Sequence, residues 1–253
     1  MRLLRKKREE TPAISLEEAL AGVDASNEKA VARAVSQFTQ AAYSFKVHLK
    51  YDYELDPQMR LTDVREIIGA YETTSPKLRD LARPNFRSLS LFNLHPESIR
   101  LMPGRGTELE ERMFNYYAIP KSISANMRRR DEFQEPPVVY MGHELCHAVE
   151  QTLLSCDFTG GNRRIFSDPS PQQLAMVSEW QALSSWKEDK RHSKWTCDPG
   201  KMSAALSSKY AQTDPSEDFC EHLTAAHDPA KRRIMEQDVP DKIAFFRKHG
   251  LID

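Results

Sequence analysis

Apolar residues recur at three- and four-residue intervals along much of this chain, which is the spacing of one face of an α-helix. The pattern is clearest over residues 137–154, where Val138, Leu145, Val149 and Leu153 fall on one side. A pair of prolines precedes it, and a helix start tolerates proline. The spacing predicts a helix over 137–154, although Gly142 interrupts it at a cost of about 1 kcal/mol relative to alanine. Close approach of another chain segment or of a substrate would account for this glycine.

The same criteria predict further helices and a few strands. Helices are expected over 16–22, 28–45, 76–82, 171–188 and 201–210, from Thr62 to before Pro76, in the first part of 107–119, from 214 to 228, and once or twice within 229–250. Alternating or short apolar runs predict strands over 46–55, 86–92, 98–102 and 122–127. Residues 103–106, 128–132, 157–171 and 187–200 are interpreted as turns or loops. We therefore expect an α+β fold that is mainly helical, with a small mixed sheet.

Composition limits the class of protein. Charged residues make up 29% of the 253 residues but nearly cancel, to a net charge of −1, so nothing demands a nucleic acid or an acidic membrane as partner. No apolar run approaches the roughly 18 residues of a membrane span. The basic start, MRLLRKKREE, lacks the apolar core of a secretory signal. We expect a disordered tail over 1–12, reduced cysteines, and a protein made in the cytosol that is either retained there or exported without a cleaved signal.

Within the helix predicted over 137–154, the chain reads His143-Glu144-Leu145-Cys146-His147. Residues four apart on a helix lie one above the other, so His143 and His147 can offer two imidazole nitrogens to one Zn²⁺. Glu144 lies beside them, where it can take a proton from a zinc-bound water. Cys146 points about 100° or more away around the helix and is expected to pack rather than bind metal. The alternative is a pair of surface histidines on an ordinary amphipathic helix.

A zinc site of this kind needs a third protein ligand. The pattern HExxHxxGxxH is excluded, because Glu150 and Leu153 stand at its glycine and final histidine positions. A carboxylate on a later helix is then expected. The two candidates are Glu179 and Glu217.

The stretch around Glu217 resembles the segment that supplies the glutamate ligand in gluzincin-type zinc metallopeptidases, and looks similar to the protease domain of anthrax lethal factor. The matching positions are Ser208, Tyr210, Ala211, Pro215, Glu217, Asp218, Phe219 and Glu221, while Cys220 stands where alanine is usual. With 137–154, the resemblance covers about a sixth of the chain. We expect a zincin-like catalytic domain over 101–253, preceded by a helical N-terminal lobe over 13–100 that is either part of the same domain or a subdomain. The resemblance also implies an edge strand before the motif helix, for which 122–127 is the candidate, to which an extended substrate can add.

The resemblance further implies roles for individual residues. Glu217 would be the third zinc ligand, and Tyr210 would point its hydroxyl at the oxyanion that forms on the scissile carbonyl. Glu221 would support a zinc-bound histidine from behind, with Asp218 as a second supporting residue. The residues themselves leave other interpretations open. Asp214, Pro215 and Glu217 also suit the first turn of a plain helix, Tyr210 a packed loop, and Glu221 an exposed helix face. Glu150, on the metal-side face three residues after His147, suits either a supporting residue or an exposed glutamate.

The sequence thus predicts a zinc-dependent endopeptidase in which Glu144 is the general base and Zn²⁺ is the cofactor. Its partner would be a protein or peptide substrate, and the setting either a housekeeping protease or an effector or toxin that acts on one protein. One alternative is a catalytically vestigial zinc-binding domain with a regulatory or interaction role. Another, a DNA-associated factor, is disfavoured by the near-neutral charge and the lack of a basic, aromatic-laced patch.

Overall fold

The computed structural model of the chain describes residues 14–51, 56–94, 114–118, 121–132, 134–154, 156–159, 168–192, 194–203 and 209–253. Four of its strands form one sheet in the order β1-β2-β4-β3. The parallel strands are β1 (Lys46–Tyr51), β2 (Ser88–Asn93) and β4 (Ser122–Asn126), and β3 (Phe114–Tyr117) runs antiparallel to β4 at the edge. Every residue of β4 is buried, as expected of an interior strand covered on both faces. The fold is mixed α+β and mostly helical.

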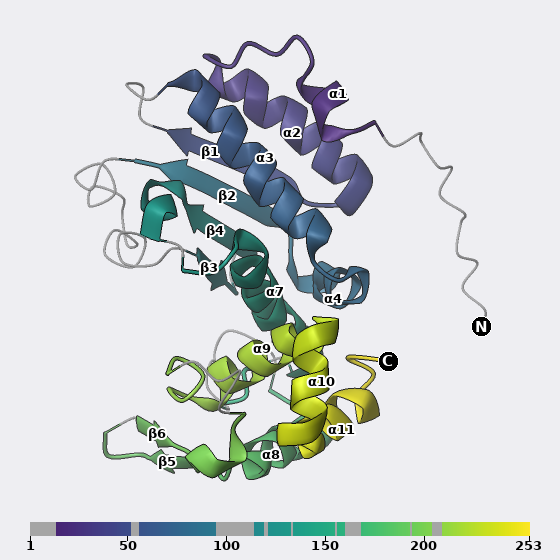
Figure 1. Cartoon of the computed structure of the whole chain (residues 1–253), viewed down its shortest axis with the longest axis vertical. Helices are drawn as coiled ribbons and strands as arrows, with labels where there is room; N and C mark the ends of the chain where they lie inside the picture. Colours follow the sequence, from purple (N-terminus) through teal and green to yellow (C-terminus); the bar gives the residue numbers. More distant parts are fainter. Residues whose placement is uncertain are drawn as a thin grey trace.

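Four helices precede or connect the parallel strands. They are α1 (Leu16–Leu20), α2 (Glu28–Tyr43), α3 (Pro57–Thr73) and α4 (Pro76–Ala82), followed by the 3₁₀ turn η1 (Arg83–Asn85). Local sequence explains their starts, because Ser15 and Glu18 form a capping box at α1, and Asn27 caps α2. In Figure 1, α2 and α3 lie over the sheet, where Val31, Val35 and Phe38 of α2 join the main core.

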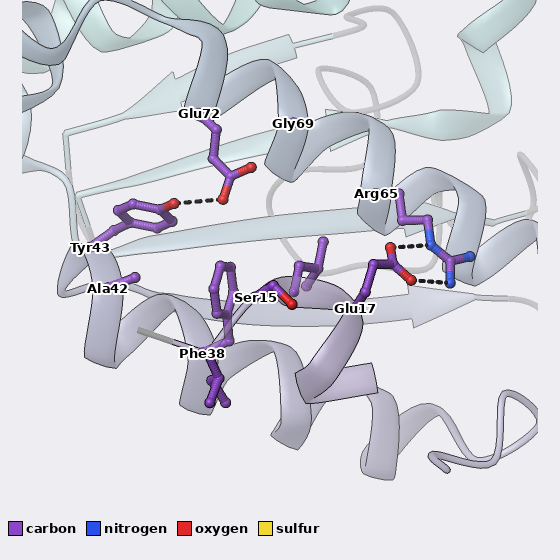
Figure 2. Close-up of a pocket in the computed structure, with 10 residues that line it drawn as sticks. Ser15, Glu17, Phe38, Ala42, Tyr43, Arg65, Gly69 and Glu72 are labelled. Carbon is purple, nitrogen blue, oxygen red and sulfur yellow. Dashed lines mark hydrogen bonds and ion pairs between the residues drawn. The ribbon is translucent and has the colours of Figure 1, made fainter. Parts of the chain in front are cut away.

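An outer groove runs between α1, α2 and α3 (Figure 2). The buried ring of Phe38 lies in it, and the Tyr43 hydroxyl donates a hydrogen bond to Glu72 across it. At the other end, Arg65 of α3 donates two hydrogen bonds, of 2.7 and 2.9 Å, to the Glu17 carboxylate. This bidentate pair fastens the short helix α1 to α3, because two parallel N–H···O bonds fix both position and orientation.

The second half of the chain is built around α7 (Pro137–Leu154), which contacts α3 and α4 as well as α9. Below it in Figure 1 lie α8 (Pro171–Leu183), α9 (Pro215–Ala226), α10 (Pro229–Asp238) and α11 (Pro240–Lys248). Each of these four begins with proline in its first turn, and Asp214 and Asp228 cap α9 and α10. One continuous core of buried apolar residues runs from Leu20 to Ile252. No helix within the described residues is both long and apolar enough to cross a membrane.

The structure corrects several predictions about the elements. Residues 114–117, in the later part of 107–119 for which no strand was predicted, form β3, and this pairing makes β4 an interior strand rather than the expected edge. The sheet takes two strands from each side of residue 100, so the N-terminal part contributes β1 and β2 as well as helices. The expected loop at 128–132 belongs to a 3₁₀ helix, η2 (Met127–Glu132).

Further corrections concern the segment between α8 and α9. The expected loop at 187–200 contains a hairpin of β5 (Lys187–Asp189) and β6 (Lys194–Thr196), and α8 ends at Leu183. The helix expected over 201–210 does not form in the described parts of that range, where 201 ends the 3₁₀ turn η3 (Pro199–Lys201) and 209–210 lie in a turn. The predictions for 1–12, 98–102 and 103–106 lie outside the described residues.

Candidate metal centre

The helix α7 places His143 and His147 one turn apart, with their ring centroids 5.0 Å from each other. The helix α9 passes close to this turn. A Cβ atom added to Gly142 would lie 3.0 Å from the Cγ2 methyl of Thr224 on α9. The glycine is therefore explained by close approach of a chain segment, as the sequence predicts, and this approach brings the first turn of α9 up to the histidines.

Glu217 lies in that first turn because the two residues at the start of α9 cap the helix and fix where it begins. Asp214 Oδ1 accepts hydrogen bonds from the backbone N–H groups of Ser216 (2.8 Å) and Glu217 (3.0 Å), and Pro215 occupies the first helical position. The cap is thus satisfied by Asp214 alone. The Glu217 side chain takes no part in it and instead reaches across to α7.

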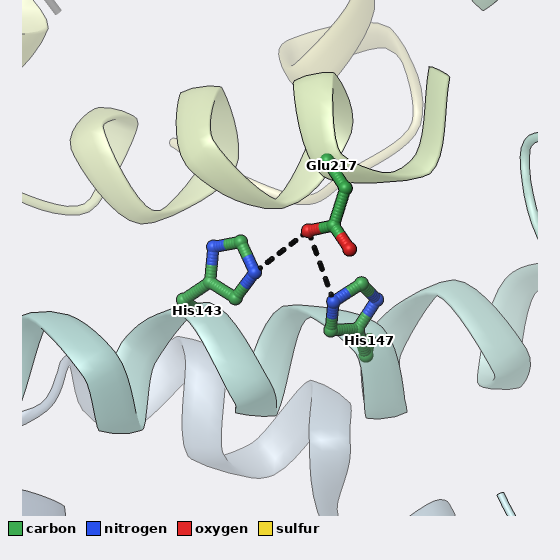
Figure 3. Close-up of side chains that lie close together, drawn as sticks. All are labelled: His143, His147 and Glu217. Atoms are coloured by element: carbon green, nitrogen blue, oxygen red, sulfur yellow. Dashed lines mark hydrogen bonds and ion pairs between the residues drawn. The ribbon is translucent and has the colours of Figure 1, made fainter. Parts of the chain in front are cut away.

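Three side chains converge between α7 and α9 (Figure 3). Glu217 Oε2 lies 3.0 Å from His143 Nε2 and 3.5 Å from His147 Nε2. Burial opposes ionisation of Glu217, but hydrogen bonds and charge from the two imidazoles outweigh it and hold its pKa well below the usual range. Two imidazole nitrogens and one carboxylate oxygen within reach of a common point form a group that can hold a metal ion.

Tyr210 and Glu221 also reach this group. The Tyr210 hydroxyl donates a 2.9 Å hydrogen bond to Glu217 Oε1, and its ring lies 5.8 Å from that of His143, with 45% of the residue exposed. Glu221, one turn beyond Glu217, places Oε1 3.5 Å from His143 Nδ1. Both therefore lie beside the three converging side chains.

Glu144 points toward the sheet side of the group. It is 8% exposed, and its carboxylate accepts a hydrogen bond from the backbone N–H of Tyr116 in β3. Burial raises the pKa of Glu144, and the positive charge that His143 and His147 can carry opposes that rise. A carboxyl group so placed favours its neutral form more than an exposed glutamate does.

A second set of polar groups lies behind His147. Its Nδ1 atom is 3.2 Å from Cys220 Sγ, 3.4 Å from Glu150 Oε2 and 3.5 Å from Ser216 Oγ. His147, Glu150 and Cys220 also meet the geometric requirement for a group that can hold a metal ion. Sequence reasoning left the role of Glu150 open and missed Ser216 and Cys220. The available signals were the three-residue step from His147 to Glu150 and the positions of Ser216 and Cys220 beside Glu217.

Two other candidates lie elsewhere. Glu179, the alternative third ligand, accepts hydrogen bonds from Lys248 Nζ (2.7 and 2.8 Å) and lies 3.3 Å from His249 Nε2, so it belongs to the α8–α11 contact. Asp218 does not support a histidine of the metal group. Its buried carboxylate bonds to Lys242, His222, Ser184 and Trp186 on the opposite side of α9. This cluster ties α9 to α11 and to the residues that follow α8.

Comparison with known proteins adds no relative to this picture. No protein-family model matches the chain, and a search of curated proteins finds no significant match. The site geometry and the chemistry of its residues therefore carry the functional argument.

Proposed function

We propose that this protein is a zinc-dependent metallopeptidase with a gluzincin-type site, in which His143, His147 and Glu217 hold the metal. The observation that carries the proposal is the convergence of His143 Nε2, His147 Nε2 and Glu217 Oε2 from two helices. It gains weight from Glu144, which follows the first histidine directly and is held by the strand that borders α7.

The donor set fits zinc. With Zn–N and Zn–O bonds of about 2.0–2.1 Å, two ligand atoms at tetrahedral positions lie about 3.3 Å apart, and the two contacts of Glu217 Oε2 measure 3.0 and 3.5 Å. Two imidazoles and one carboxylate also match the catalytic zinc sites that keep a fourth position open. When bound there, zinc supplies Lewis acidity, which polarises a carbonyl and lowers the pKa of a water molecule.

Side chains of the protein would carry out the proton transfers and stabilise the oxyanion. Glu144 would accept the proton of the attacking water at its carboxylate and deliver it to the leaving amine nitrogen. The N–H of Tyr116 would keep that carboxylate in place. The Tyr210 hydroxyl, which bonds to Glu217 Oε1 and is partly exposed, would turn to donate a hydrogen bond to the developing oxyanion.

The substrate class that suits this arrangement is an extended polypeptide. The edge strand β3 borders α7, and its Tyr116 contacts Glu144. An extended peptide that passes along this side of α7 would present its backbone carbonyls to the zinc ligands one after another.

The proposal is tested by metal analysis and peptide cleavage on the same preparations. Wild-type protein should bind one zinc per chain, His147→Ala and Glu217→Gln should lose it, and Glu179→Gln, a matched glutamate in another helix, should keep it. Glu144→Gln should keep zinc but lose cleavage of a random peptide library, whereas wild type cleaves it in a chelator-sensitive way. Full zinc in Glu217→Gln would refute the ligand set. A zinc-loaded wild type that cleaves no member of the library would instead support the vestigial binding domain.

A further inference from the structure

Glu150 is a buried carboxylate whose one ion-pair partner among the described residues is His147. It is 2% exposed and lies three residues after His147 on α7. One of its oxygens, Oε1, accepts a hydrogen bond from the backbone N–H of Phe158. The other, Oε2, accepts a 2.7 Å hydrogen bond from the Ser216 hydroxyl of α9 and lies 3.4 Å from His147 Nδ1. A carboxylate this deeply buried is stable only when such donors surround it.

The direction of the Ser216 hydroxyl proton decides which group accepts a hydrogen bond from His147 Nδ1. Because the Ser216 hydroxyl proton points at Glu150 Oε2, only its lone pairs could face the imidazole, at 3.5 Å. Cys220 Sγ is 3.2 Å away but is a weak hydrogen-bond partner in either direction. A carboxylate oxygen of Glu150 is the strongest acceptor of the three. It therefore favours the tautomer in which Nδ1 carries the proton and the lone pair of Nε2 is left for the metal.

We propose that Glu150 is a positioning residue for the metal site, which fixes the tautomer and ring orientation of His147, and that Ser216 holds Glu150 in place from α9. This inference rests on the proposed zinc site and adds to it a residue that touches neither metal nor substrate. Hydrogen-bond partners behind a ligating histidine typically change metal affinity by about 10- to 100-fold when they are removed.

In this arrangement, two residues in the first turn of α9 would affect the same metal ion, one directly and one through other side chains. Glu217 reaches the metal directly, and Ser216 reaches it through Glu150 and His147. Phe158 extends the support to the segment after α7, because its N–H occupies Oε1 and leaves Oε2 for Ser216 and the imidazole.

Glu150→Gln is the decisive substitution because it keeps the shape of the side chain but replaces one acceptor oxygen with an N–H donor. An amide donor facing Nδ1 favours the opposite tautomer, with the proton on Nε2, where metal must bind. We expect zinc affinity, measured by competition with a chromophoric chelator, to fall about 10- to 100-fold. In the metal-free protein, at a pH high enough that the His147 ring is neutral, ¹⁵N spectra of the histidine rings should show His147 change from the Nδ1–H to the Nε2–H form. Ser216→Ala should weaken zinc binding less, and Glu150→Asp should be intermediate.

Several outcomes would overturn the inference. Equal zinc affinity and unchanged histidine spectra in Glu150→Gln would mean that Glu150 only stabilises the fold, especially if its metal-free form unfolds more easily than wild type. Two zinc ions per wild-type chain, reduced to one in Cys220→Ala, would assign His147 Nδ1, Glu150 and Cys220 to a second metal instead. If wild-type protein binds no zinc, the proposed function itself fails. If wild type binds zinc and Glu150→Gln binds it with the same affinity, the proposed zinc site is kept and only the role of Glu150 is refuted.

Discussion

Gly142 offers a direct test of how closely α7 and α9 pack. Replacing it with alanine should recover about 1 kcal/mol of helix propensity, but the new Cβ would lie 3.0 Å from Thr224 Cγ2, well inside ordinary van der Waals contact. Overpacking of this kind costs about 1–3 kcal/mol. We therefore expect Gly142→Ala to lower the free energy of unfolding by about 1 kcal/mol, measured by urea denaturation of the metal-free protein.

The companion change is Thr224→Ser, which removes the obstructing methyl group and keeps the hydroxyl that lies 3.4 Å from Cys146 Sγ. In this background, Gly142→Ala should stabilise the protein by up to about 1 kcal/mol, since only the helix propensity term is left. The double-mutant cycle should then give a coupling energy of about 2 kcal/mol. A coupling energy below about 0.5 kcal/mol would refute the reasoning, because it would show that the Thr224 methyl does not exclude a side chain at position 142.

Three further predictions concern other parts of the molecule. Burial and the nearby charges of Arg232 and Lys77 lower the pKa of His227 to about 4, against the opposing charge of Asp253. Because the unfolded state takes up the proton near pH 6.5, the free energy of unfolding should be highest above that pH and fall by about 3 kcal/mol as the pH drops to about 4. Urea titrations of His227→Gln should lack this fall. Lys242→Met, which takes the lysine away from the buried carboxylate of Asp218 and leaves only His222 to pair with it, should cost about 3 kcal/mol. Lys248→Met, at the partly exposed pair with Glu179, should cost at most about 1 kcal/mol, and similar losses would contradict the contrast between the two pairs. Zinc at 100 times its dissociation constant should stabilise wild type by about 2.7 kcal/mol, and an equal effect on Glu217→Gln in thermal unfolding would speak against that ligand.

Local sequence signals predicted those parts of the fold that depend on neighbours along the chain. The helix spacing over 137–154 and the proline-led helix starts in the second half correspond closely to α7, α9, α10 and α11. The strand β3 was missed because its four residues carry no clear alternation, and it is a strand only through pairing with β4. The position of β4 inside the sheet was missed for the same reason, since strand order is a property of the tertiary structure.

In the candidate site, too, the sequence predicted what depends on local spacing but not what depends on the packing of helices. Two histidines four residues apart must share a helix face, so the spacing alone brings His143 and His147 together. Only the resemblance of its surrounding residues favoured Glu217 over Glu179, because the spacing along the chain does not show which of the two carboxylates reaches the histidines. Glu150 could be placed on the metal-side face of α7, but its burial could not be inferred without knowing that Ser216 and Phe158 cover it.

The contacts between α7 and α9 run in opposite directions along the two helices. Gly142 meets Thr224, His147 meets Cys220, and Glu150 meets Ser216. A slide of one helix by a single turn, about 5.4 Å, would break all three contacts and carry Glu217 away from the histidines. One register of α7 against α9 is therefore needed for all three features: the packing of the Thr224 methyl on Gly142, the convergence of the metal ligands, and the hydrogen bonds behind His147. A substitution that alters the helix spacing at Gly142 acts on the metal site through that register, although it touches none of the ligands.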